Sequence, residues 1–143
     1  MPPSSGGAFE AVAASLRAAE LRRDLTVDEI SAPAGVAPQA IAFAGDVHPP
    51  GHGIDSQLGT GRFILLHDPA SPEGWDGEFR IVVYAQAPLE RDIGSDPLLP
   101  EVAWSWLQSA LDDLGAPRHA MSGTATTVLS TGFGSLAEQD ANA

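Results

Sequence analysis

The clearest pattern along the chain predicts an amphipathic helix that starts near Leu99 and ends near Leu114. Apolar residues recur there at intervals of three and four, and polar residues such as Glu101 and Asp112 fill the opposite side. Asp96-Pro97 or Pro100 suits the first turn, and Gly115 suits a left-handed cap after the last one. A second amphipathic helix is predicted over about residues 8–23, with Phe9 at the start of its apolar face.

Four other segments have the patterns of strands. In residues 39–47, Ile41 and Phe43 alternate with alanines, which predicts a strand with one bulky and one flat face. Residues 61–67 are apolar on both faces, as in a central strand, and residues 79–86 alternate again. Residues 124–131 are rich in threonine and valine, which favour strands.

This order, helix–strand–strand–strand–helix–strand, predicts an α+β fold. We expect an antiparallel sheet of about four strands with two main helices packed on it. Residues 8–137 are expected to form a single domain. Residues 1–7 and 138–143 are small and polar and are expected to be disordered.

Charge and composition exclude several classes of function. The net charge is −12, and all seven basic residues are scattered arginines, which argues against direct binding of nucleic acid. There is no cysteine, so disulfides, thiolate metal sites and a cysteine nucleophile are excluded. We see no signal peptide and no apolar run of about 20 residues, and therefore expect a cytoplasmic protein without membrane contact.

The segment between the second and third of these strands gathers the side chains that could carry chemistry. His67, Asp68, Glu73 and Asp76 could bind a hard metal ion or act as an acid–base pair. Asp68-Pro69 and Asp76-Gly77 are also typical turn dipeptides. We favour the turn, and keep a metal-dependent hydrolase or metal-binding protein as the alternative.

A second group of metal-binding residue types lies at Asp46, His48, His52 and Asp55. The sequence Pro49-Pro50-Gly51 forbids the helix that would put the two histidines on one face, so a solvated loop is expected. No nucleophile elbow and no dinucleotide fingerprint is found. The sequence therefore predicts no catalytic residue and no cofactor.

Three aromatic residues suggest a contact surface for another protein. On a helical wheel Trp106 lies inside the apolar stripe and Trp104 at its edge, while Trp75 lies in a loop and Tyr84 on a strand. Partly exposed tryptophan and tyrosine are favoured anchors at interfaces. We expect Trp75, Tyr84 and Trp104 to form an interaction surface of a non-catalytic accessory domain, with an unknown protein partner. A homodimer resembling small secretion chaperones is a further alternative, on fold order alone.

A family resemblance covers most of residues 8–136. It is carried by Leu65-Leu66-His67-Asp68-Pro69, Trp75-Asp76-Gly77-Glu78-Phe79-Arg80, Asp96-Pro97-Leu98-Leu99-Pro100, Trp104-Ser105-Trp106-Leu107 and Phe133-Gly134. These strings resemble an actinobacterial family of domains of unknown function, the one numbered three thousand. The resemblance implies no catalytic or binding residues. Members of that family are encoded beside a ribonuclease D-like exonuclease, which implies an accessory role to such an enzyme as another alternative.

Overall fold

The computed structural model describes residues 5–47 and 59–136. The chain divides into two compact units, residues 1–88 and 89–143, and each is described here by itself. The first unit holds helix α1 (Ser5–Arg17) and strands β1 (Leu25–Ile30), β2 (Gln39–Val47), β3 (Thr60–His67) and β4 (Phe79–Gln86). The second holds α2 (Arg91–Gly94), α3 (Leu99–Asp113) and a 3₁₀ turn, η1 (Gly134–Leu136).

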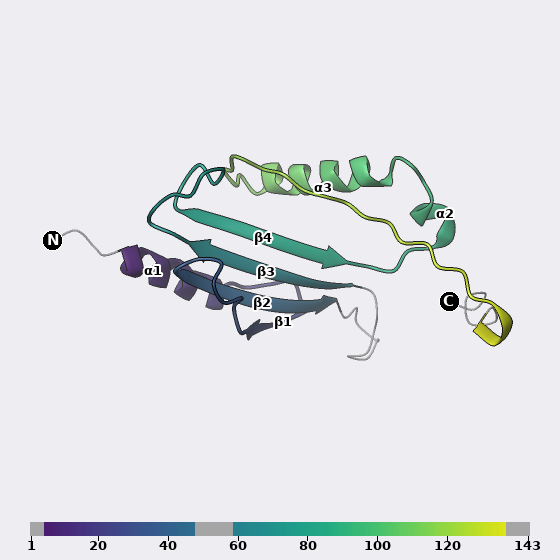
Figure 1. Cartoon of the computed structure of the whole chain (residues 1–143), viewed down its shortest axis with the longest axis horizontal. Helices are drawn as coiled ribbons and strands as arrows, with labels where there is room; N and C mark the ends of the chain where they lie inside the picture. The colour runs from purple at the N-terminus through teal and green to yellow at the C-terminus, as the bar shows by residue number, and fades with distance from the viewer. Residues whose placement is uncertain (1–4, 48–58, 137–143) are drawn as a thin grey trace. The chain divides into compact units, whose positions relative to one another are not determined.

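The four strands form one antiparallel sheet in the order β1-β2-β3-β4, so each strand pairs with the next one in the chain (Figure 1). Ile41 of β2 lies opposite Leu65 of β3, which in turn lies opposite Ile81 of β4. Because side chains alternate along a strand, these three residues point to the same face of the sheet. The register thus defines two faces, and β1 and β4 are the two edges.

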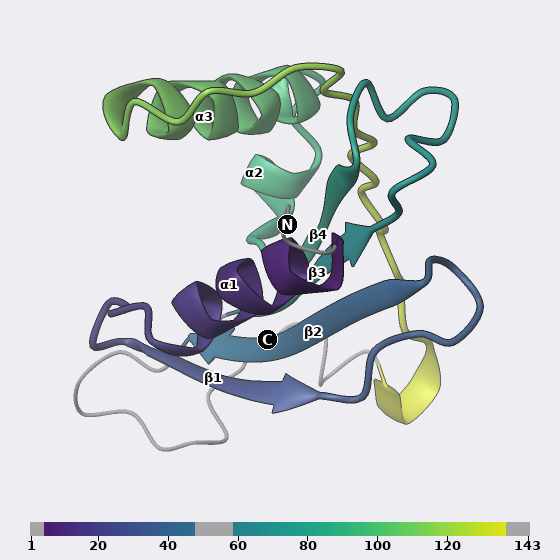
Figure 2. The same cartoon turned by 90° about the vertical axis from the view of Figure 1, so that its left-hand side faces the viewer.

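Helix α1 covers one of these faces, as Figure 2 shows over β2. Phe9 and Ala13 of α1 pack with Ile41 and Leu65, and all four side chains are buried. The flanking positions on the same side are partly buried and complete this core: Leu16, Phe43, Phe63 and Phe79. The core therefore lies between α1 and the central strands, and we call this side the α1 face.

In the second unit, the end of α3 is closed by its own backbone. Gly115 has a φ of 65°, and its N–H donates to the carbonyl of Asp112. The N–H of Ala116 donates to the carbonyl of Leu111, which completes a Schellman motif. The cap predicted at Gly115 is confirmed.

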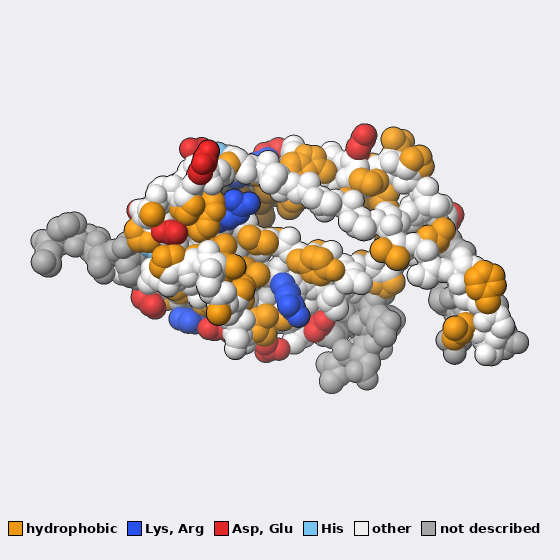
Figure 3. Space-filling view, in the orientation of Figure 1, with side chains coloured by type: hydrophobic (Ala, Val, Ile, Leu, Met, Phe, Trp, Pro, Cys, Tyr) orange, Lys and Arg blue, Asp and Glu red, His pale blue; other side chains and the backbone are white. Residues whose placement is uncertain are grey.

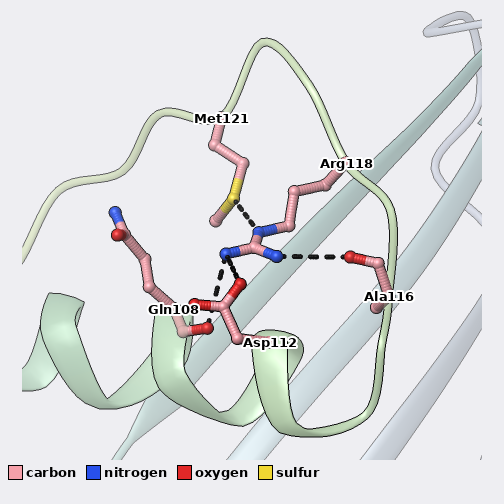
Figure 4. Close-up of polar contacts among 5 residues, drawn as sticks. All are labelled: Gln108, Asp112, Ala116, Arg118 and Met121. Carbon is pink, nitrogen blue, oxygen red and sulfur yellow. Dashed lines mark hydrogen bonds and ion pairs between the residues drawn. The ribbon is translucent and has the colours of Figure 1, made fainter.

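Arg118 then ties the returning chain to this end of α3 (Figure 4). Its guanidinium forms an ion pair with Asp112 at 2.7 Å and donates to the backbone carbonyls of Gln108 and Ala116. A fourth contact joins its Nε to the sulfur of Met121 at 3.2 Å. A cation at a helix C-terminus also interacts favourably with the helix dipole. One side chain therefore fixes the direction in which the chain leaves α3.

The predicted α+β class with a four-stranded antiparallel sheet is confirmed, but its fourth strand lies elsewhere in the chain. Residues 124–131 form no strand, and the fourth strand is β1, which we did not predict. Helix α1 begins at Ser5 and ends at Arg17, rather than spanning residues 8–23. Expectations for residues 1–4 and 138–143 lie outside the described residues.

Candidate functional site

The connection between β3 and β4 is built as a turn around Asp68. The backbone N–H of Asp68 donates to the carbonyl of Glu78 at 2.8 Å, which closes the turn where the two strands meet. The carboxylate of Asp68 accepts a hydrogen bond from the N–H of Ala70 at 2.9 Å. Farther along, Asp76 has a φ of 54° and Gly74 a φ of 90°, both in the left-handed region. These contacts give Asp68 the turn-forming role that its sequence context favours.

His67, the last residue of β3, is completely buried. Its ring stacks against Phe9 of α1, with centroids 6.1 Å apart, and lies tilted against the ring of Phe79 of β4, with centroids 4.4 Å apart. The register puts His67 on the α1 face, opposite Gln39 on one side and Phe79 on the other. The imidazole is therefore a part of the core between α1 and the sheet.

The two ring nitrogens of His67 have different surroundings. Nδ1 lies 2.7 Å from Oε1 of Gln39, and since an amide oxygen only accepts, Nδ1 carries the proton and donates. Nε2 is buried and has no hydrogen-bond partner among the described residues. The nearest carboxylate oxygen recorded for it, Oε2 of Glu78, is 3.8 Å away, which is beyond hydrogen-bond distance. Nε2 is thus a buried polar atom without a hydrogen-bond partner in the described part of the chain.

The four residues predicted as a metal site are not brought together around a common point. His67 is buried, whereas Glu73 and Asp76 are exposed and Asp68 bonds to its own turn. Within residues 5–47 and 59–136, no group of three or more histidine, aspartate or glutamate side chains could hold a metal ion. Asp46 lies in β2, and His48, His52 and Asp55 lie outside the described residues.

Strand β4 is the most exposed apolar element of the first unit. From Arg80 to Gln86 every residue is exposed, although the strand is rich in β-branched and aromatic residues. On the α1 face, Ile81 and Val83 are 58% and 63% exposed, and on the other face Val82 and Tyr84 are 40% and 59% exposed. Since β4 is an edge strand, one of its backbone edges lacks a strand partner in the described part of the chain.

The three aromatic residues predicted as an interaction surface differ in exposure and surroundings. Tyr84 is exposed on β4, and its hydroxyl donates to Oε1 of Gln86 at 3.1 Å. Trp75 is half-buried in the turn between β3 and β4, where its backbone N–H donates to the carbonyl of Pro72. Trp104 is a residue of α3 and belongs to the second unit.

Trp104 is half-buried because the chain after α3 returns across its indole ring. A Cβ built on Gly123 would lie 2.8 Å from Cζ3 of Trp104, so the backbone of Gly123 itself packs on the ring. Trp106, which the helical wheel places in the apolar stripe, is 68% exposed. The half-burial of Trp104 is thus due to a residue after the helix, which a helical wheel does not include.

Sequence reasoning identified β4 as a strand but missed that it is an edge. We expected residues 124–131 to supply a further strand, and with it another partner for the sheet. The chain connectivity offered a signal, because strands that are consecutive in the chain are neighbours in the sheet about two-thirds of the time. That rule places β4 at the end of the sheet whenever no later strand joins it.

Comparisons with known proteins add a family and nothing about activity. A family model described as "Protein of unknown function (DUF3000)" matches residues 5–143. No curated protein and no solved structure matches the chain. In the part of the chain that the structure describes, no helix is long and apolar enough to span a membrane.

Proposed function

The chain belongs to the DUF3000 family, whose description states no function, and from the geometry we propose that it is a protein-interaction domain that binds a partner polypeptide along edge strand β4. The observation that carries the proposal is the exposure of an eight-residue edge strand on both of its faces. Tyr84, one of the predicted contact residues, belongs to this surface. The proposal does not depend on Trp104.

Exposed edge strands are usually protected against further pairing. Natural proteins place lysine, proline, a bulge or a very short strand there. Strand β4 has neither proline nor glycine, and Arg80 is its single charged residue. An extended segment of a partner can therefore add to the sheet, with backbone hydrogen bonds along β4 and side-chain contacts on alternate positions.

The apolar side chains of β4 would supply the hydrophobic part of the binding free energy. Ile81, Val82 and Val83 are each at least two-fifths exposed. Complete burial of such a side chain contributes about 1.5–3 kcal/mol, and these three have part of that area left to bury. A charged substitution at the centre of the strand should therefore remove a large share of the affinity.

Cross-linking and affinity capture from the organism that encodes the chain test this proposal. We expect Val83→Glu to reduce recovery of specific partners by about tenfold or more, as for a central interface residue. Val36→Glu is the matched control, because Val36 is 52% exposed in the β1–β2 connection, away from β4. It should leave recovery unchanged.

The outcomes separate the alternatives. If folded Val83→Glu protein recovers the same partners as the unsubstituted protein, the β4 proposal is wrong. A ribonuclease D-like exonuclease whose recovery depends on Val83 would identify the accessory role that the family resemblance implies. Circular dichroism of each variant establishes that it is folded before recovery is compared.

A further inference from the structure

Strands β3 and β4, at the β4 edge of the sheet, differ in charge from the rest of the chain. The chain has 19 acidic residues and only seven basic ones. Strands β3 and β4 contain no aspartate or glutamate, yet they hold Arg62 and Arg80. Figure 3 shows basic and hydrophobic side chains together over this part of the sheet. An acidic molecule thus presents a locally basic strand pair at its exposed edge.

Both arginines are exposed, and neither has a carboxylate partner among the described residues. Three other arginines do: Arg17 pairs with Glu29, Arg22 with Asp24 and Arg118 with Asp112. In a chain with so many carboxylates, the guanidinium groups of β3 and β4 are left available for an external anion.

The register puts the two arginines on the face of the sheet opposite α1. Arg62 lies directly opposite Tyr84, and Arg80 lies opposite Leu66. Arg80 and Tyr84 are four positions apart on β4, which corresponds to about 13 Å along the strand. Ile64 and Val82 form the cross-strand pair between them. This face therefore has an apolar centre with an arginine near each end.

We propose that the polypeptide bound along β4 is an acidic, extended segment of a partner protein, with a carboxylate opposite Arg80 and apolar side chains opposite Val82 and Tyr84. This inference rests on the proposed function. Opposite charges on directly facing strand positions stabilise pairing, and a guanidinium can bind a carboxylate through two parallel hydrogen bonds. Arg62 lies one strand farther away and adds to the potential that attracts the segment.

A second copy of this chain is a poorer occupant of the same edge. Strand β4 has no carboxylate to place opposite Arg80 of another copy. Charge complementarity therefore selects an acidic segment of a different protein.

Selection from a displayed library of random twelve-residue peptides tests the chemistry with the full chain as bait. We expect the peptides selected by the unsubstituted protein to be enriched in aspartate and glutamate. Their affinity should fall about tenfold or more in Arg80→Glu and should fall as ionic strength rises. Selection against Arg80→Glu should favour lysine and arginine instead. Arg23→Glu is the matched control, since Arg23 is exposed in the α1–β1 connection and has no carboxylate partner among the described residues.

The outcomes distinguish failure of this inference from failure of the β4 proposal. Peptides that require Val83 but show no acidic enrichment would overturn this inference and leave the β4 proposal standing. Failure to select any peptide that depends on β4 would count against both. A dimer in light scattering that Val83→Glu dissociates would make a second copy the occupant, and would overturn the acidic segment.

Hydrogen exchange tests whether the free backbone edge of β4 is accessible in the monomer. We expect the outward-facing amides of β4 to exchange rapidly in the free monomer and to become protected when a selected acidic peptide is added. Slow exchange of those amides in the monomer without peptide would mean that the edge is already covered, and both proposals would be wrong.

Discussion

The buried imidazole of His67 depends on a single side-chain hydrogen bond. Its Nδ1 donates to Oε1 of Gln39 over 2.7 Å, and the imidazole is completely buried, with the rings of Phe9 and Phe79 packed against it. Removing the acceptor would leave a polar hydrogen buried without a partner. Such a group costs about 1–3 kcal/mol, because its hydration is lost and nothing replaces it.

We therefore predict that Gln39→Ala lowers the free energy of unfolding of the sheet by about 1–3 kcal/mol. Urea unfolding followed by far-ultraviolet circular dichroism measures this change. Gln86→Ala is the matched control, since Gln86 is exposed at the end of β4 and its hydrogen bond with Tyr84 is exposed too, and surface changes of this kind stay within about 0.5 kcal/mol. Equal losses in the two variants would contradict the role assigned to the Gln39–His67 bond.

At the scale of elements, helix α1 is tied to edge strand β1 by one ion pair. Arg17, the last residue of α1, donates through Nε to Oε1 of Glu29 at 2.8 Å and through a second nitrogen to Oε2 at 3.2 Å. The hydrogen bond from Arg17 lowers the pKa of Glu29 below its ordinary value of 4.5, and the same bond raises the pKa of Arg17. Both side chains are exposed, so the contribution to stability is small.

The sign of the pH dependence follows from the lowered pKa of Glu29. Its contribution to stability is complete above pH 4.5 and is lost as pH falls through the lower pKa of the folded state. We predict that Glu29→Gln lowers the melting temperature slightly at neutral pH and that this difference disappears in acid. Thermal unfolding of both proteins across that range measures it, with Glu20→Gln as an exposed control. A difference that persists in strong acid would contradict the prediction.

At the scale of the whole molecule, charge is the dominant feature. A net charge of −12 makes the folded chain repel itself, whereas the recorded ion pairs are at least partly exposed and individually weak. Salt screens both kinds of interaction. The repulsion involves many more charges than the attraction, so screening should favour the folded state.

We predict that the melting temperature at pH 7 rises when NaCl increases from about 0.01 M to about 0.15 M, where the screening length falls from about 30 Å to about 8 Å. The same titration near the isoelectric point, at about pH 4.4, is the control, because the net charge is then close to zero. The stabilising effect of salt should vanish there. A fall in melting temperature with salt at pH 7 would show that attractive pairs outweigh the repulsion.

The periodic elements were predictable, and the two errors in the sheet have one physical origin. Strands β2, β3 and β4 and helix α3 have patterns that specify their type without help from the rest of the molecule. Strand β1 is short and carries Asp28 and Glu29, and it is a strand because β2 pairs with it. Residues 124–131 have the composition of a strand but no strand partner. Strand propensity depends on such pairing, which local composition does not contain.

The sequence by itself determined the fold class, the turn at Asp68, the cap at Gly115 and the acidity of the chain, because each depends on neighbouring residues or on composition. Only the tertiary structure decided that His67 belongs to the core, that Trp104 is covered by Gly123, and that β4 is an exposed edge. Those properties depend on which distant segments pack together. A histidine beside acidic residues in the sequence can belong to a reactive site or to the hydrophobic core, depending on which segments pack around it. His67 packs between the rings of Phe9 and Phe79.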